Sequence, residues 1–202
     1  VYDIVSNSSD HTTLKTAIDA CGLDGYLSAS GPFTLFAPTD AAFNLLPSGT
    51  VAALLNDIPQ LTDILLHHVA ADSLMSSMLI NGQIVTTLLG SNITVTINTN
   101  GVFIDNAQVI VADLVADNGV VHVIDAVLLP ISGCTDPTAC NYDPSANTDD
   151  GSCLTDYGCT DPTAFNFDPA ATCDDGSCVA IIYGCTDPLA INYFPGANTD
   201  DG

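Results

Sequence analysis

The residues with the clearest chemical potential lie between Gly133 and Cys153, in a segment that reads GCTDPTACNYDPSANTDDGSC. Oxygen-bearing side chains occupy alternate positions in this segment, and further carboxylates flank the run. Alternate spacing in a loop lets successive side chains turn toward one centre, as in the calcium loop of an EF-hand. Carboxylate and amide oxygens are hard ligands that suit Ca²⁺. The residues concerned are Asp136, Asn141, Asp143, Ser145, Asn147, Asp149 and Asp150.

The segment occurs three times. It returns as Gly158–Cys178 and again as Gly184–Gly202, and the first cysteines of the copies follow one another at intervals of 25 and 26 residues. A fixed period of this length indicates tandem modules. The candidate Ca²⁺ ligands are the positions that recur in all copies, together with Asp143 and its counterpart Asp168. The recurring positions are Asp136, Asn141, Asp149 and Asp150, then Asp161, Asn166, Asp174 and Asp175, and finally Asp187, Asn192, Asp200 and Asp201.

The same residues have a second interpretation as turn formers, because Asp-Pro and Asp-Gly make good turns without a metal. The spacing is not the strict D-x-D-x-D-G pattern of an EF-hand, so it specifies the class of metal better than the individual ligands. A zinc site is disfavoured, since residues 133–202 contain neither a Cys-x-x-Cys pair nor a histidine.

Seven of the eight cysteines lie in the repeats, and their positions allow a pairing hypothesis. One pair brackets copy one and another brackets copy two, while Cys140 and Cys173 have no cysteine counterpart in the neighbouring copy. We therefore predict a bridge between the two copies. Sequence alone does not prove connectivity. The expected pairs are Cys134–Cys153, Cys159–Cys178 and Cys140–Cys173, and Cys185 is expected to pair with a cysteine beyond Gly202.

Composition divides the chain near Ile131. Residues 1–131 are rich in Leu, Ile, Val and Ala, whereas residues 133–202 are loop-like. All 24 acidic residues are aspartate, Lys15 is the single Lys or Arg, and the formal net charge is −23. This charge argues against binding to nucleic acid or to anionic membrane surfaces, and no apolar run reaches the roughly 18–20 residues of a membrane span. Clustered cysteines indicate an oxidising, extracellular compartment.

The first 131 residues show helical patterns followed by strand patterns. Helices are expected within residues 1–30, over 41–46, 51–56 and 60–67, with Thr39 or Asp40 as an N-cap and Gly22 at a C-cap. Strands are expected at 33–37, 84–89, 92–98, 102–104, 109–111, 120–124 and 127–129. Three Asn-Gly pairs between them favour type I′ hairpin turns. Helices followed by hairpin-linked strands predict an α+β domain with a β-sandwich-like body.

Three segments of this region, FTLFAPTDAAFNLLP, DILLHHVA and NGVVHVIDAVLLP, resemble the signature segments of the fasciclin (FAS1) domain. The resemblance implies a FAS1 fold over residues 1–131 and an extracellular adhesion module rather than an enzyme. His67 stands where the family usually has Tyr. The repeats resemble Asp- and Cys-rich repeats of secreted Bacteroidetes proteins and, more loosely, the calcium-binding type 3 repeats of thrombospondin. The expected domains are 1–131, 132–157, 158–183 and 184–202, the last of them incomplete.

These patterns favour a secreted, calcium-dependent adhesion or surface-structural protein, with a FAS1 head on repeats stiffened by Ca²⁺ and disulfides. A self-assembling filament subunit and a glycan-binding module of a larger secreted protein are the alternatives. The expected partners are an extracellular protein, a polysaccharide or a second copy of the chain. No G-x-S-x-G elbow or phosphate loop supports an enzyme, and His68 and His122 are expected in the core. The chain begins at Val1 and is expected to be a mature or trimmed fragment.

Overall fold

A computed structural model describes all residues from 1 to 202, and the chain divides into two compact units. The first unit contains Val1–Ser132 together with Ser145–Asp149. The second contains Gly133–Pro144 and Asp150–Gly202. The composition break near Ile131 therefore coincides with the end of the main part of the first unit, but a short segment of copy one also belongs to that unit. No helix in the chain has both the length and the apolar character needed to cross a membrane.

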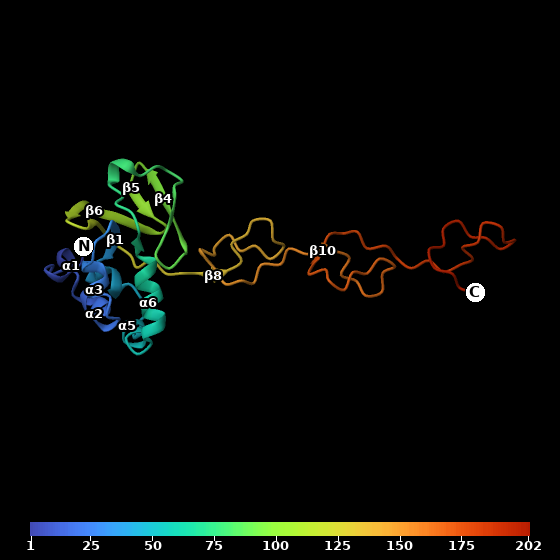
Figure 1. Cartoon of the computed structure of the whole chain (residues 1–202), viewed down its shortest axis with the longest axis horizontal. Coiled ribbons are helices and arrows are strands. Elements are labelled where there is room, and N and C mark those ends of the chain that lie inside the picture. Colours follow the sequence, from blue (N-terminus) through green and yellow to red (C-terminus); the bar gives the residue numbers. More distant parts are fainter. The chain divides into compact units, whose positions relative to one another are not determined.

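The helices of the first unit are short. Three α-helices precede the first strand and three follow it, and a single turn of 3₁₀ helix lies farther along the chain. Figure 1 shows α1, α2, α3, α5 and α6 grouped on one side of β1, with β4 and β5 on the other side. The helices are α1 Tyr2–Ser6, α2 Thr12–Ala20, α3 Asp24–Ser28, α4 Asp40–Asn44, α5 Thr50–Leu54, α6 Ile58–His67 and the 3₁₀ helix Ser76–Met78.

Seven strands form one mixed sheet with the order β2-β1-β7-β6-β5-β4-β3. β1 and β7 are parallel neighbours, and the other neighbouring strands are antiparallel. The α+β class expected from the sequence is therefore confirmed for the first unit. The strands are β1 Phe33–Pro38, β2 Val69–Ala70, β3 Ile84–Thr86, β4 Asn92–Asn98, β5 Gly101–Ile104, β6 Ala107–Ala116 and β7 Gly119–Ile124.

β1 lies between two apolar clusters, and all six of its residues are buried. Phe33, Leu35 and Ala37 pack into a cluster with the helices, whereas Phe36 packs into a second cluster with the later strands. Alternate residues of a strand point to opposite faces of its sheet, so a continuous apolar run is what a strand buried on both faces requires. β4 alternates instead, with Ile93 buried and Thr94 exposed, because one face of that strand meets solvent.

Local capping explains where several helices begin and end. Thr39 caps α4, since its side-chain oxygen accepts a hydrogen bond from the Ala42 amide at 3.1 Å. Asp57 caps α6 in the same way through the Gln60 amide at 3.2 Å. Gly22 follows α2 with φ of +65°, the left-handed conformation that ends many helices. Thr39 and Gly22 were both expected at these positions from the sequence.

The predicted strand at 127–129 is wrong. Val127 and Leu128 are buried, but the Leu128 amide donates to His68 Nε2 at 3.0 Å instead of to a neighbouring strand. The prediction for 109–111 is too short, because β6 runs for ten residues and contains two register shifts. An apolar run shows that a segment is buried, but it does not reveal which acceptor its amides find.

The Asn-Gly pairs mark turns, but the expectation of type I′ geometry is wrong. Only the glycine of each pair has positive φ, and the asparagine does not. In the connection from β4 to β5, the side chain of Asn98 accounts for the departure from type I′ geometry. Its oxygen accepts the Asn100 amide at 2.7 Å and forms a local turn. Asn118 binds the chain elsewhere, donating from Nδ2 to the carbonyls of Leu27 and Ala29 at 2.8 Å each.

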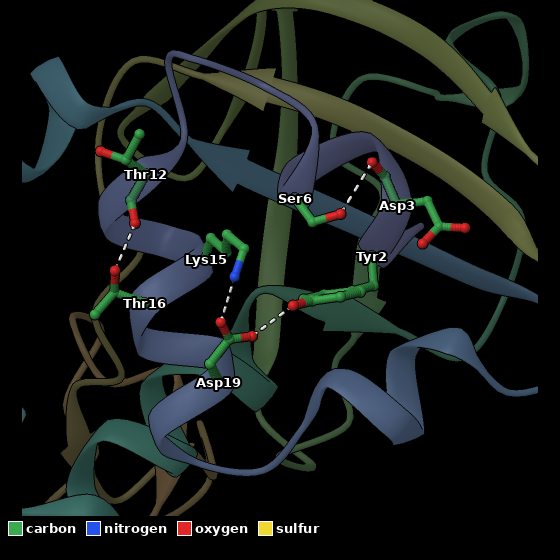
Figure 2. Close-up of polar contacts among 7 residues, drawn as sticks. All are labelled: Tyr2, Asp3, Ser6, Thr12, Lys15, Thr16 and Asp19. Atoms are coloured by element: carbon green, nitrogen blue, oxygen red, sulfur yellow. Dashed lines mark hydrogen bonds and ion pairs between the residues drawn. The ribbon is translucent and has the colours of Figure 1, made fainter.

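The single lysine of the chain lies on α2 in a small polar cluster. Figure 2 shows Lys15 and Tyr2 both reaching Asp19, so that one carboxylate joins α1 to α2. The Lys15 ammonium and, secondarily, the Tyr2 hydroxyl lower the pKa of the Asp19 carboxyl. All three groups are exposed to solvent, so this contact contributes little to stability.

The second unit has little regular structure. β10 Tyr157–Gly158 and β11 Cys173–Asp174 form a short parallel pair. The other two-stranded pair, β8 Ser132–Gly133 with β9 Thr148–Asp149, consists of first-unit residues apart from Gly133. The three copies share a backbone pattern in which the first cysteine carbonyl accepts an amide nine residues on. These bonds join Cys134 to Asp143 at 3.0 Å, Cys159 to Asp168 at 2.9 Å and Cys185 to Phe194 at 3.0 Å. The sequence repeat is therefore also a repeat of local structure.

Candidate functional site

The first recurring aspartate of each copy organises a turn. Asp136 Oδ1 accepts both the amide and the hydroxyl of Thr138, at 2.8 and 2.7 Å, and Asp161 makes the same two bonds with Thr163. In copy three, Asp187 accepts the amide of Leu189 at 2.9 Å. The threonine amide is the main cause that lowers the pKa of Asp136 and of Asp161, and the threonine hydroxyl adds to it. These carboxylates are therefore held in their charged form by their own chain.

The recurring asparagine clamps the two ends of its copy together. Asn141 donates from Nδ2 to the Ser152 carbonyl at 2.7 Å and accepts the Leu154 amide at 2.8 Å through Oδ1. Asn166 makes the corresponding bonds to Ser177 and Val179, each at 2.8 Å. An amide is required here because one side chain must donate and accept at once. Asn192 has no such pair of bonds, since the position that corresponds to Ser152 lies beyond Gly202.

The Asp-Asp-Gly segment near the end of each copy also forms turns. Asp150 and Asp175 accept the amides of Ser152 and Ser177, each at 2.9 Å, and the serine lowers the pKa of either carboxyl. Three more of the candidate residues accept an amide two residues on. These are Asp168 with Ala170 at 2.9 Å, Asp174 with Gly176 at 3.0 Å and Asp200 with Gly202 at 3.4 Å.

The structure brings no three carboxylates, imidazoles or thiols together in the way that a formed metal centre requires. Twelve of the fourteen candidate ligands are exposed, and only Asp136 and Asp143 are half-buried. Most of them already accept a backbone amide, which a bound cation would have to compete with. The arrangement therefore supports the turn-forming interpretation, and Ca²⁺ ligation by these residues stays a prediction.

Three disulfides hold the second unit. Cys134–Cys153 and Cys159–Cys178 each close one copy across a Cα–Cα distance of 4.8 Å. Cys140–Cys173 joins copy one to copy two across 6.0 Å. These are the pairs that comparison of the copies predicts. Cys21 and Cys185 are free thiols. The expected partner of Cys185 would lie beyond Gly202, so that disulfide stays a prediction.

His68 and His122 lie in the apolar interior of the first unit, as expected. His68 Nδ1 donates to the Ile64 carbonyl at 2.7 Å and Nε2 accepts the Leu128 amide, so the ring is neutral and fully bonded. Burial lowers the pKa of His68 to about 4. His122 Nε2 donates to the Leu74 carbonyl at 2.7 Å while Nδ1 accepts the Asp113 amide at 3.3 Å. Both rings hold segments in place and present no atom to a substrate.

Sequence reasoning missed a buried polar network around His67, the last residue of α6. His67 is fully buried, and its Nδ1 bonds to the hydroxyl of Ser91. The Thr87 hydroxyl lies 2.7 Å from Ser91 Oγ, and it also lies 3.2 Å from the Ser91 carbonyl oxygen. Burial lowers the pKa of His67 to about 4. The signal in the sequence was His67 itself, a polar replacement at a position where an aromatic residue is usual in the family it resembles.

Comparison with known proteins places these features in context. The family profile for the fasciclin domain matches residues 9–130. The protein sll1735 of Synechocystis sp. is 43% identical over 129 residues, which is 64% of this chain and 96% of that protein. The immunogenic protein MPB70 of Mycobacterium bovis is 35% identical over 134 residues, covering 62% of this chain and 66% of that protein.

Longer proteins contain related segments. The transforming growth factor-beta-induced protein ig-h3 of Sus scrofa is 31% identical over 136 residues, which is 67% of this chain but only 20% of that protein. Among solved structures, a fasciclin domain pair from the insect cell adhesion molecule fasciclin I matches with a TM-score of 0.43 and 26% identity, over 63% of this chain and 50% of that one. All these matches span about two thirds of the chain or less.

Proposed function

We propose, from the premise that this chain belongs to the fasciclin domain family, that it is an extracellular adhesion or surface-structural protein. The family membership and the mixed α+β sheet identify the first unit as a FAS1 fold. Three disulfides in the second unit support an oxidising, extracellular location. The relatives described above carry names that refer to immunogenicity, to induction by a growth factor or to adhesion, and none of those names denotes a catalytic activity.

The observation that carries this proposal is the exposed apolar surface of β6. This strand contains two register shifts, and Ile110 and Val111 are about half exposed while Val115 is 69% exposed. β-bulges often occur next to functional sites, where they redirect side chains away from a core. The sequence of this strand is apolar, yet much of it is not used in the interior. We assign this strand as the face of the fasciclin domain that contacts an extracellular protein or polysaccharide.

Attachment assays test the assignment. The full chain is coated on a surface, and binding of cells, matrix proteins and a panel of polysaccharides is measured. Val115→Asp should abolish most of the attachment without changing the unfolding midpoint, because the side chain is exposed. Leu45→Asp is the matched control, since Leu45 is 76% exposed but lies just after α4. Equal attachment by both variants, or none by the parent chain, would exclude this face.

Calcium dependence is a further prediction, supported by the net charge of −23 and by the exposed carboxylates of the repeats. Ca²⁺ must displace amides from the turn aspartates, so we expect weak, saturable binding with dissociation constants of roughly 10⁻⁴–10⁻³ M, as in extracellular modules. Isothermal titration calorimetry of the full chain measures it, with Mg²⁺ as the control ion. Absence of heat at millimolar Ca²⁺ would leave the carboxylates with their turn-forming role alone.

Self-association distinguishes a monomeric adhesin from the filament alternative. Light scattering coupled to size-exclusion chromatography, with Ca²⁺ and with EDTA, reports the mass directly. The proposed adhesin gives the mass of one chain, 20.8 kDa, in both buffers. A mass that rises with Ca²⁺ would instead favour the filament subunit, because cations would have to screen the repulsion between two highly acidic chains.

A further inference from the structure

The segment Ser145–Asp149 lies in copy one by sequence but belongs to the first compact unit. Two backbone bonds of Asn147 fix it there. Its amide donates to the Ile131 carbonyl at 3.0 Å, and its carbonyl accepts the amide of Asn92, at the start of β4, at 2.9 Å. The segment is therefore bonded both to the chain that leaves the fasciclin domain and to the first residue of β4 in its sheet.

The Asn147 side chain makes further bonds to the same region. Oδ1 accepts the Ile131 amide at 2.7 Å, which fixes the orientation of the side-chain amide. Nδ2 then lies 3.4 Å from the Leu129 carbonyl and 3.4 Å from His67 Nε2. Because Nδ2 can only donate, the Leu129 carbonyl, His67 Nε2 and the Asp105 carboxylate are its available acceptors.

Copy three shows which part of this arrangement is generic. Asn198, the counterpart of Asn147, accepts the Ile182 amide and donates to the Ala180 carbonyl, at 2.8 Å each. Each asparagine thus binds the residues two and four positions before the first glycine of its own copy. Only Asn147 also meets a buried histidine and a strand of the fasciclin domain, so its additional bonds are specific to that position.

We propose that Ser145–Asp149 is a built-in ligand of the fasciclin domain, docked through Asn147 on a polar site formed by His67, Asn92 and Ile131. The fasciclin domain is then incomplete at residue 131. Its folded unit requires a segment that the sequence assigns to the first repeat.

Amide exchange of the full chain, measured by NMR, tests the docking. Asn147→Ala should lower the protection factors of the Asn92 and Ile131 amides about tenfold, the factor expected when a hydrogen bond to a buried group is lost. Asn198→Ala is the matched control, which should lower protection at Ile182 and leave Asn92 unchanged. Unaltered protection of Asn92 in Asn147→Ala would overturn the proposal.

Discussion

The spacing of the Asp and Asn residues in the repeats does not show whether a given side chain ligates Ca²⁺ or caps a turn. A short oxygen-bearing residue that ligates Ca²⁺ and one that caps its own turn look identical in a sequence, because both require Asp or Asn before a flexible backbone. Comparison of the copies selected the recurring positions as candidate Ca²⁺ ligands, and that role stays a prediction. The hydrogen bonds of Asp136 and Asn141 then showed what those positions do in the structure.

The asparagine clamp of copy two can be tested at one residue. Asn166→Ala removes both the donor to the Ser177 carbonyl and the acceptor of the Val179 amide. We expect exchange of the Val179 amide to quicken by about tenfold, equivalent to about 1.4 kcal/mol of local stability. Asn192→Ala serves as the control, because Asn192 has no such bonds. An unchanged Val179 amide in the first variant would show that Cys159–Cys178 alone holds the loop.

The buried histidines predict the response of the fasciclin domain to acid. Burial lowers the folded-state pKa of His67 and of His68 to about 4, below the ordinary value of 6.5. The unfolded chain therefore binds protons first as the pH falls. Stability is fully present above pH 6.5 and declines toward pH 4, by up to about 1.4 kcal/mol per pH unit for each histidine. Urea unfolding at pH 7, 6 and 5 measures this slope.

His67→Tyr, which introduces the residue usual in the family, should retain about half of that pH dependence. The aspartates with lowered pKa values act only at lower pH, near and below their ordinary value of 3.8, so they do not contribute above pH 5. Equal stability of the parent chain at pH 7 and pH 5 would be incompatible with neutral, buried imidazoles.

At the scale of elements, the meeting of β1 and β7 depends on a glycine. Gly119 has φ of +151°, and a Cβ built there would lie 1.9 Å from the Phe33 carbonyl oxygen. Gly119→Ala must therefore separate the two parallel strands, and we expect it to cost more than about 2 kcal/mol of unfolding free energy. Gly22→Ala is the comparison, since Gly22 also has positive φ but no atom within 4 Å. Similar losses in thermal unfolding of the two variants would refute the close approach.

Elements set by apolar periodicity and caps were predictable, whereas those set by distant polar partners were not. The buried run 33–37 and the cap at Thr39 are local signals, and both appear in the structure. The course of β6 depends on Asp113, which has φ of +60° and accepts the Ser76 amide at 2.7 Å from 37 residues away. No residue near Asp113 in the sequence predicts its hydrogen bond with Ser76. The same holds for Leu128, whose amide finds His68.

At the scale of the whole molecule, sulfur bonds compensate for a second unit without an apolar core. Cys140–Cys173 spans 33 residues and links two copies that are also closed internally. By chain entropy such a bond contributes up to about 3–4 kcal/mol, and less when shorter bridges already constrain the loop. Replacing both cysteines by serine should lower the melting temperature of the repeats in calorimetry.

Cys185→Ser is the control for that experiment, because Cys185 is a free thiol. The fasciclin transition should stay in place in both variants. If the double variant melts as the parent chain does, the turn hydrogen bonds of the copies must hold the repeats without help from the bridge between them.

The contact between Lys15 and Asp19 has a consequence for handling the protein. Trypsin cleaves after Lys or Arg, so Lys15 is its one target in 202 residues. That target lies inside α2, and cleavage there requires the helix to open locally. Even complete digestion leaves two fragments, 1–15 and 16–202, with every disulfide in the larger one. Peptide mapping of the bridges therefore needs a protease that cuts at aspartate, the residue this chain has in abundance.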